Sequence, residues 1–123
     1  MTAVRPRQPS SETSITAQIV GHRTVLAVEG EIDLQTTPAL AAAIDEAIAS
    51  GAAELWVDLT ATQFMDSSGV HALVAAHRRT DELNRRLAVI CPPGRPVRRL
   101  FDIAGAAAVL PLYDDRAAAH RAA

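Results

Sequence analysis

The sequence predicts an α/β protein with a mostly parallel, mixed sheet of about five strands and about four helices. Short apolar runs alternate with segments whose apolar residues recur at helical spacing, which is the order of strand–helix crossover units. An early pair of strands, joined by a two-residue break, adds one antiparallel strand. Aromatic residues make up only 3% of the 123 residues although 49% are apolar. Ala, Val, Leu and Ile must therefore build the core, which suits helices packed on a sheet.

The first residues differ in composition from the rest. Residues 1–14 combine prolines with hydroxyl and charged side chains and have almost no apolar content. Such a segment cannot bury enough surface to offset the entropy of ordering. We expect a disordered tail over residues 1–14 and a single domain over residues 15–123.

The first half of the domain contains a hairpin and a helix. Residues 15–20 and 23–28 are rich in β-branched side chains and flank Gly21-His22, which predicts a hairpin turn. Thr37 is the expected cap of the following helix, because Pro38 suits a first helical position. The helix buries an apolar face and ends at Gly51.

The second half repeats strand and helix. Residues 54–59 alternate as a strand does, a loop is expected over residues 60–66, and a second helix follows with its apolar stripe. Residues 87–91 form a buried strand before the prolines. A third helix is expected over residues 96–104, a short strand over residues 109–112, and an Ala-rich helix from Asp114.

Charge and composition exclude several kinds of function. The formal charge is −2 and the basic residues are scattered, which argues against nucleic-acid binding. Cys91 is the single cysteine, so no internal disulfide forms and a reducing compartment is expected. No apolar run reaches the ~20 residues that span a bilayer, and the first residues lack the apolar stretch of a signal peptide. We expect a cytoplasmic protein.

The opening of the second helix is the segment best suited to chemistry. In open α/β sheets, function concentrates where strands lead into helices. Asp66 or Ser67 can cap the helix, while Ser68 and Gly69 keep its first turn small and leave the backbone open to a partner. Met65 precedes them, and we expect it to be exposed for that partner.

A hydroxyl at a helix N-terminus is well placed to carry phosphate. Free amides and the positive end of the helix dipole stabilise the added oxygens. Phosphorylation adds about −1.5 to −2 charges, which can break an interface that tolerated a neutral serine. Asp33 and Asp66 are expected nearby and would make that charge locally repulsive.

Four segments together resemble the STAS-domain anti-sigma factor antagonists of bacteria. They are Glu29-Gly30-Glu31-Ile32-Asp33, Val57-Asp58-Leu59, the run from Phe64 to Val70, and the run from Val97 to Gly105. The resemblance covers most of residues 16–112. It implies the same alternation of strands and helices.

The resemblance also implies a partner switch. Such proteins bind an anti-sigma factor that is a serine kinase of the histidine-kinase-like ATPase class, and so release a sigma factor. The kinase then phosphorylates the antagonist, which dissociates, and a metal-dependent serine phosphatase restores it.

Individual site residues follow from the same resemblance. The phosphoserine follows the family's aspartate, which assigns phosphorylation to Ser67, with Ser68 as the second choice. Asp33 is assigned a role in binding or orientation. The other partner-binding candidates are Met65, Asp66, Ser68, Gly69 and His71, and His71 stands where small residues are common.

Other functions are less well supported. The nucleophile elbow of hydrolases needs glycine two positions before the serine, where Met65 stands, so we expect no enzyme. The histidines and the cysteine show no paired ligand spacing, so we expect neither a metal nor a cofactor. One alternative stays open, namely a non-phosphorylated STAS adaptor subunit of a signalling scaffold or a lipid-transport complex.

Overall fold

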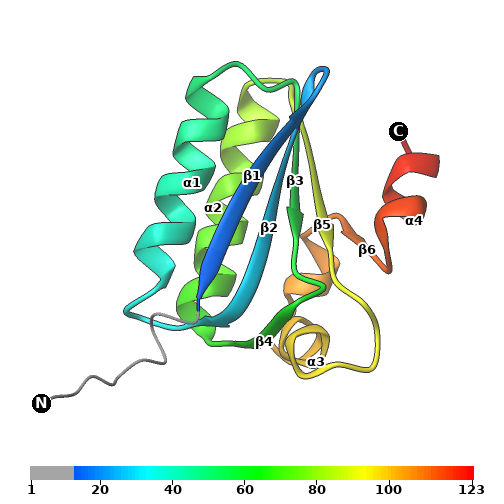
Figure 1. Cartoon of the computed structure of the whole chain (residues 1–123). Helices are drawn as coiled ribbons and strands as arrows, with labels where there is room; N and C mark the ends of the chain where they lie inside the picture. Colours follow the sequence, from blue (N-terminus) through cyan, green and yellow to red (C-terminus); the bar gives the residue numbers. More distant parts are fainter. Residues whose placement is uncertain (1–12) are drawn as a thin grey trace, which may run out of the picture.

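A computed structural model describes residues 13–123 and arranges them as one mixed sheet with helices on both faces (Figure 1). The described strands follow the order β1-β2-β3-β5-β6, and β4 pairs with the end of β2. The elements along the chain are β1 (Ser14–Val20), β2 (Arg23–Ile32), α1 (Thr37–Ala49), β3 (Glu54–Asp58), β4 (Thr62–Met65), α2 (Ser67–Glu82), β5 (Arg86–Ile90), α3 (Pro96–Ile103), a 3₁₀ turn (Ala106–Ala108), β6 (Leu112–Tyr113) and α4 (Arg116–Arg121).

The predicted opening hairpin is confirmed, and β1 is the antiparallel strand of the sheet. Val20 pairs with Arg23 across a two-residue loop. Gly21 takes a φ of 61° in the first loop position, as a type II′ turn requires. All the other pairings of the sheet are parallel, because helices or loops cross over between those strands.

Three helices cover one face of the sheet and enclose the main core. Figure 1 shows α1 and α2 side by side along this face, with α3 near the end of the sheet where β4 lies. The largest fully buried side chains of this cluster come from α1, α2, α3 and the inner positions of the strands: Leu26, Ile32, Leu40, Leu55, Leu59, Leu73 and Phe101. Apart from Phe101 the set is aliphatic, as the composition predicted.

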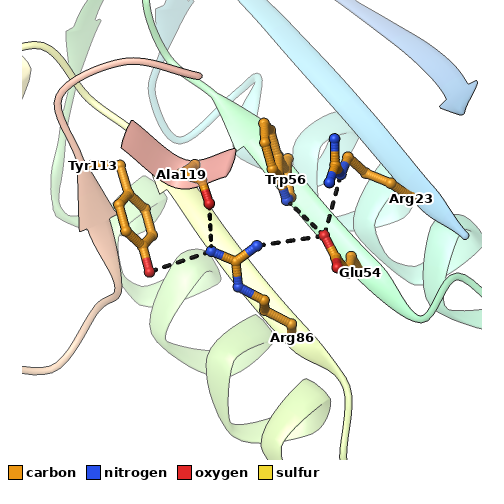
Figure 2. A network of polar contacts seen from close by, with 6 residues as sticks. All are labelled: Arg23, Glu54, Trp56, Arg86, Tyr113 and Ala119. Atoms are coloured by element: carbon orange, nitrogen blue, oxygen red, sulfur yellow. Dashed lines mark hydrogen bonds and ion pairs between the residues drawn. The ribbon is translucent and has the colours of Figure 1, made fainter. Parts of the chain in front are cut away.

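The opposite face is covered only in part, by the short helix α4. Figure 2 shows the polar contacts there. The Glu54 carboxylate accepts hydrogen bonds from Arg23 at 3.1 Å, from the Trp56 indole at 3.2 Å and from Arg86 at 3.4 Å. Arg86 also donates to the Ala119 carbonyl of α4 at 2.8 Å. This network joins β2, β3, β5 and α4.

Several boundaries differ from the sequence-based expectation. The expected loop over residues 60–66 contains β4, which pairs with β2 after a register shift beside Gly30. Gly30 has a φ of 97°, a conformation that lets β2 bend there. The last strand is Leu112–Tyr113 rather than residues 109–112, because the amides of Val109 and Leu110 bond back to the Ala106 carbonyl of the 3₁₀ turn. The helix cap is Thr36, and Thr37 is the first helical residue.

The expected N-terminal tail falls almost wholly outside the described residues, which begin at Thr13. Ser14 is already the first residue of β1, and the Thr13 hydroxyl donates to the Glu31 carbonyl at 2.8 Å. The strand therefore starts one residue before the expected domain boundary.

Cys91 lies buried just beyond β5, with 1% of its surface exposed. Burial raises the pKa of its thiol to about 11, against a smaller opposite effect of Arg98. The thiol is therefore protonated at neutral pH, which fits a small core residue.

Candidate functional site

The expected site lies where the ends of β2 and β4 meet the start of α2. Ile32 and Met65 pair across the two strands, and the Asp66 amide donates to the Ile32 carbonyl at 3.0 Å. Asp33 and Asp66 each follow one of these paired residues. The two segments that carry the candidate residues are therefore neighbours, as the sequence predicted.

Asp66 is the cap of α2. Its carboxylate accepts from the Ser68 amide at 2.9 Å and from the Ser68 hydroxyl at 2.5 Å. The hydroxyl bond is the main cause that lowers the pKa of Asp66 below its ordinary value, and backbone amides that include that of Leu34 add to it. Asp66 therefore carries a negative charge at neutral pH.

Ser67 and Ser68 differ in what holds their hydroxyls. The Ser68 hydroxyl is bonded to Asp66 and also lies 2.8 Å from the Thr37 hydroxyl in the first turn of α1. Ser67, the first residue of α2, is exposed, and its hydroxyl has no hydrogen-bond partner within residues 13–123. Ser67 is thus the serine whose oxygen is open to a reagent, while Ser68 connects two helix starts.

The expected exposure of Met65 is wrong. Only 4% of its surface is exposed, because its side chain points into the core beneath the first turn of α2. A Cβ atom at Gly69 would lie 2.6 Å from the Met65 Cγ and 2.9 Å from the Ile32 Cγ2. Gly69 is therefore needed for close packing of α2 on the strands, and it does not open the backbone to a partner.

Asp33 holds the turn between β2 and α1. Its carboxylate accepts from the amides of Gln35 at 2.9 Å and Thr36 at 3.1 Å. The Thr36 hydroxyl accepts from the Asp33 amide at 2.8 Å and donates to the Glu31 carbonyl at 2.9 Å. These bonds set the path of the loop that carries Leu34, which is an orienting role.

The sequence reading missed two exposed apolar side chains around the site. Leu34 is 77% exposed, and its amide contributes to the lowered pKa of Asp66. Phe64 in β4 is 46% exposed and lines a groove of about 240 Å³ with Pro96, Leu100 and Ile103 of α3. The four residues of β4, Thr-Gln-Phe-Met, show no alternation of polar and apolar side chains and are too few to separate a strand from a loop.

His71 is exposed on α2, four residues after Ser67. Residues four apart lie on the same side of a helix. His71 is therefore available to a partner that contacts Ser67.

Residues 13–123 hold no group of three or more His, Cys, Asp or Glu side chains that could bind a metal ion. None of the helices in this part of the chain is long and apolar enough to cross a membrane.

Comparison with known proteins gives a consistent assignment. The STAS domain family matches residues 14–119. The anti-sigma F factor antagonist of Paenibacillus polymyxa is 35% identical over 97 residues, which cover 76% of this chain and 82% of that protein. The anti-sigma-F factor antagonist RsfB of Mycobacterium tuberculosis is 39% identical over 72 residues, which cover 57% of this chain and 59% of that protein.

Solved structures agree with the sequence matches. The crystal structure of an anti-sigma factor antagonist from Mycobacterium paratuberculosis superposes with a TM-score of 0.77 and 30% identity, covering 85% of this chain and 87% of that one. The family match spans most of the domain, and the site residues lie within it. The chain belongs to the STAS-domain family of anti-sigma factor antagonists.

Proposed function

We propose that this protein is a partner switch controlled by phosphorylation of Ser67. The unphosphorylated form binds an anti-sigma factor, which is a serine kinase of the histidine-kinase-like ATPase class, and so releases a sigma factor. Phosphorylation of Ser67 ends the binding, and a serine phosphatase reverses it. Because its partners control transcription, we place the protein in the cytoplasm.

The observation that carries the proposal is the open hydroxyl of Ser67. A kinase needs a serine oxygen that is exposed and free of strong bonds. Ser67 is exposed at the first position of α2, whereas the Ser68 hydroxyl is held by Asp66 and Thr37. This contrast favours Ser67 as the phosphate acceptor.

Asp66 supplies a reason for the phosphorylated form to lose its partner. The Asp66 carboxylate already accepts from the first amides of α2, and its pKa is lowered. A phosphate on Ser67 would add about −1.5 to −2 charges beside this fixed charge. The new charge would face an interface that had closed over a neutral hydroxyl.

Leu34 and Phe64 supply apolar area for the partner. Both are substantially exposed and lie on the segments that flank the start of α2. Large exposed apolar side chains near a functional residue are typical of protein interfaces. We assign the partner contact to Leu34, Phe64, Ser67 and His71, with Asp33, Asp66 and Ser68 holding the backbone in place.

Phosphosite mapping tests the acceptor. The tagged protein is used to capture partners from a lysate of its own organism, with and without ATP, and the phosphate is located by mass spectrometry. We expect phosphate on Ser67, none on the Ser67→Ala variant, and phosphate on the Ser68→Ala variant. Phosphate confined to Ser68 or to another residue would contradict the assignment.

Titration with the captured kinase tests the switch. Ser67→Asp should weaken binding at least tenfold, or by about 1.4 kcal/mol, while Ser67→Ala should bind as the wild type does. Ala117→Asp, which adds the same charge at an exposed position of α4 on the opposite face of the sheet, should have little effect. Equal affinity for Ser67→Asp and wild type would favour the non-phosphorylated adaptor instead.

A further inference from the structure

We propose that β1 is a self-association surface, through which two copies of this chain join their sheets by antiparallel pairing of β1 with β1. The proposal is independent of the partner switch. It rests on the free edge of the sheet: within residues 13–123, β1 pairs only with β2 and no strand lies beyond it (Figure 1).

The β1 edge lacks the usual protection against strand pairing. Soluble proteins block exposed edges with charged residues, proline, bulges or very short strands. β1 has seven residues, Ser-Ile-Thr-Ala-Gln-Ile-Val, without a charge or a proline, and it pairs with β2 in unbroken register. Every residue except Ile15 is exposed, Ile19 to 71% and Val20 to 53%.

The hairpin determines which backbone groups face outward. Val20 and Arg23 close a two-residue loop, so they form a hydrogen-bonded pair. Alternate residues back along β1 bond to β2 in the same way. The amides and carbonyls of Ile15, Ala17 and Ile19 therefore point to the free edge.

These residues make the strand complementary to itself. A two-fold axis at Ala17 places Ala17 opposite Ala17 and Ile15 opposite Ile19 of the second copy. Each such pair can exchange two hydrogen bonds, since all of these groups point outward. On the other face Thr16 lies opposite Gln18 and Ser14 opposite Val20, so the central pairs match apolar with apolar and polar with polar, and β1 brings no like charges together.

An apolar groove beside β1 favours a second copy as the occupant. The groove has a volume of about 290 Å³ between β1 and α1, and the outward-bonding residues Ile15, Ala17 and Ile19 line it together with Leu26 and Ala43. The isoleucines of a second copy would extend this apolar face across the axis. The same pairing that satisfies the backbone would thus cover the groove.

The predicted dimer is weak and leaves both switch sites open. A pair of seven-residue strands buries less than the ~1,200 Å² of a stable interface, so dimerisation should depend on concentration. The two-fold axis directs the two β2 strands in opposite directions. The two copies of Ser67 would therefore lie at opposite ends of the joined sheet.

Site-specific crosslinking tests the register. Facing Ala17 residues would have Cα atoms about 5.5 Å apart, which a disulfide can span. Two Gln18 residues would be about 8 Å apart, beyond that reach. With the native Cys91 buried, Ala17→Cys should crosslink on mild oxidation at least ten times faster than Gln18→Cys.

Sedimentation tests the association without oxidation. The wild type should shift from monomer to dimer as its concentration rises. For Ala17→Lys, the protein concentration at the midpoint of this shift should be at least tenfold higher. Ala75→Lys, which adds the same charge on α2, should behave as the wild type does. A wild type that stays monomeric at high concentration, or equal crosslinking of the two cysteine variants, would refute the β1 pairing.

Discussion

Two adjacent serines occupy the first turn of α2 and have different surroundings. The Ser68 hydroxyl joins Asp66 to Thr37, so it ties the start of α2 to the start of α1. Ser67 is exposed, and its hydroxyl has no hydrogen-bond partner within residues 13–123. A serine at position 68 thus stabilises the contact between two helices, whereas a serine at position 67 is available for modification.

This difference predicts unequal effects on stability. Ser68→Ala should lower the free energy of unfolding by about 1–3 kcal/mol, because the charged Asp66 and the Thr37 hydroxyl each lose a partner. Ser67→Ala should change it by less than about 0.5 kcal/mol, as exposed substitutions usually do. Urea unfolding of both variants measures this, and equal losses would contradict the assigned contacts.

The short helix α4 is held on the outer face of the sheet by polar contacts with β3 and β5. Arg86 donates to the Ala119 carbonyl at 2.8 Å, and Arg116 pairs with Asp58 of β3 at 2.7 Å. Ala119 itself is fully buried. A helix of six residues is not stable in isolation, so these contacts are what keep it in place.

Loss of Arg86 should therefore loosen α4. Arg86→Ala should lower the free energy of unfolding by about 1.5–3 kcal/mol through its charged hydrogen bonds. Trp56, the single tryptophan of the chain, is 2% exposed beneath this face. Its fluorescence emission should shift to the red in the variant.

Arg121→Ala is the matched control for that experiment. Arg121 is an exposed residue of the same helix, so its removal should leave the Trp56 emission unchanged. An Arg86→Ala protein with wild-type emission and unchanged amide exchange in α4 would show that Arg86 does not hold the helix.

The stability of the whole molecule should fall in acid because of Asp58. Burial by itself would raise the pKa of Asp58, but bonds from Thr60 and Arg116 outweigh it and lower the pKa below 3.8. A carboxyl whose pKa is lowered by folding stabilises the fold above its unfolded pKa. This contribution is fully present at neutral pH and is lost as the pH falls from about 4.

Unfolding measured from pH 7 to pH 2.5 checks this sign. Asp58→Asn should be less stable than the wild type at pH 7, and the difference should narrow below about pH 4, where the wild type loses the same charge. Asp81→Asn removes a charge from an exposed position of α2, so its difference from the wild type should stay small. A constant difference for Asp58→Asn across the range would contradict the lowered pKa.

Local patterns in the sequence were enough to predict the alternating fold, the opening hairpin and the serine-bearing helix start. Each depends on neighbouring residues: the Gly21 turn, the Asp66 cap, and the apolar repeats of α1 and α2. The resemblance to the antagonist family added the choice of Ser67 over Ser68.

Contacts between distant segments were decided only by the tertiary structure. Met65 is apolar and precedes an exposed turn, and nothing local showed that β4 would pair with β2 and turn this side chain inward against Gly69. The exposure of Leu34 and Phe64 and the Thr37–Ser68 contact likewise depend on segments that lie far apart in the sequence. Burial and strand pairing depend on which segments pack against each other in the fold. When the contacting residues are more than 30 positions apart, no local sequence pattern predicts the contact.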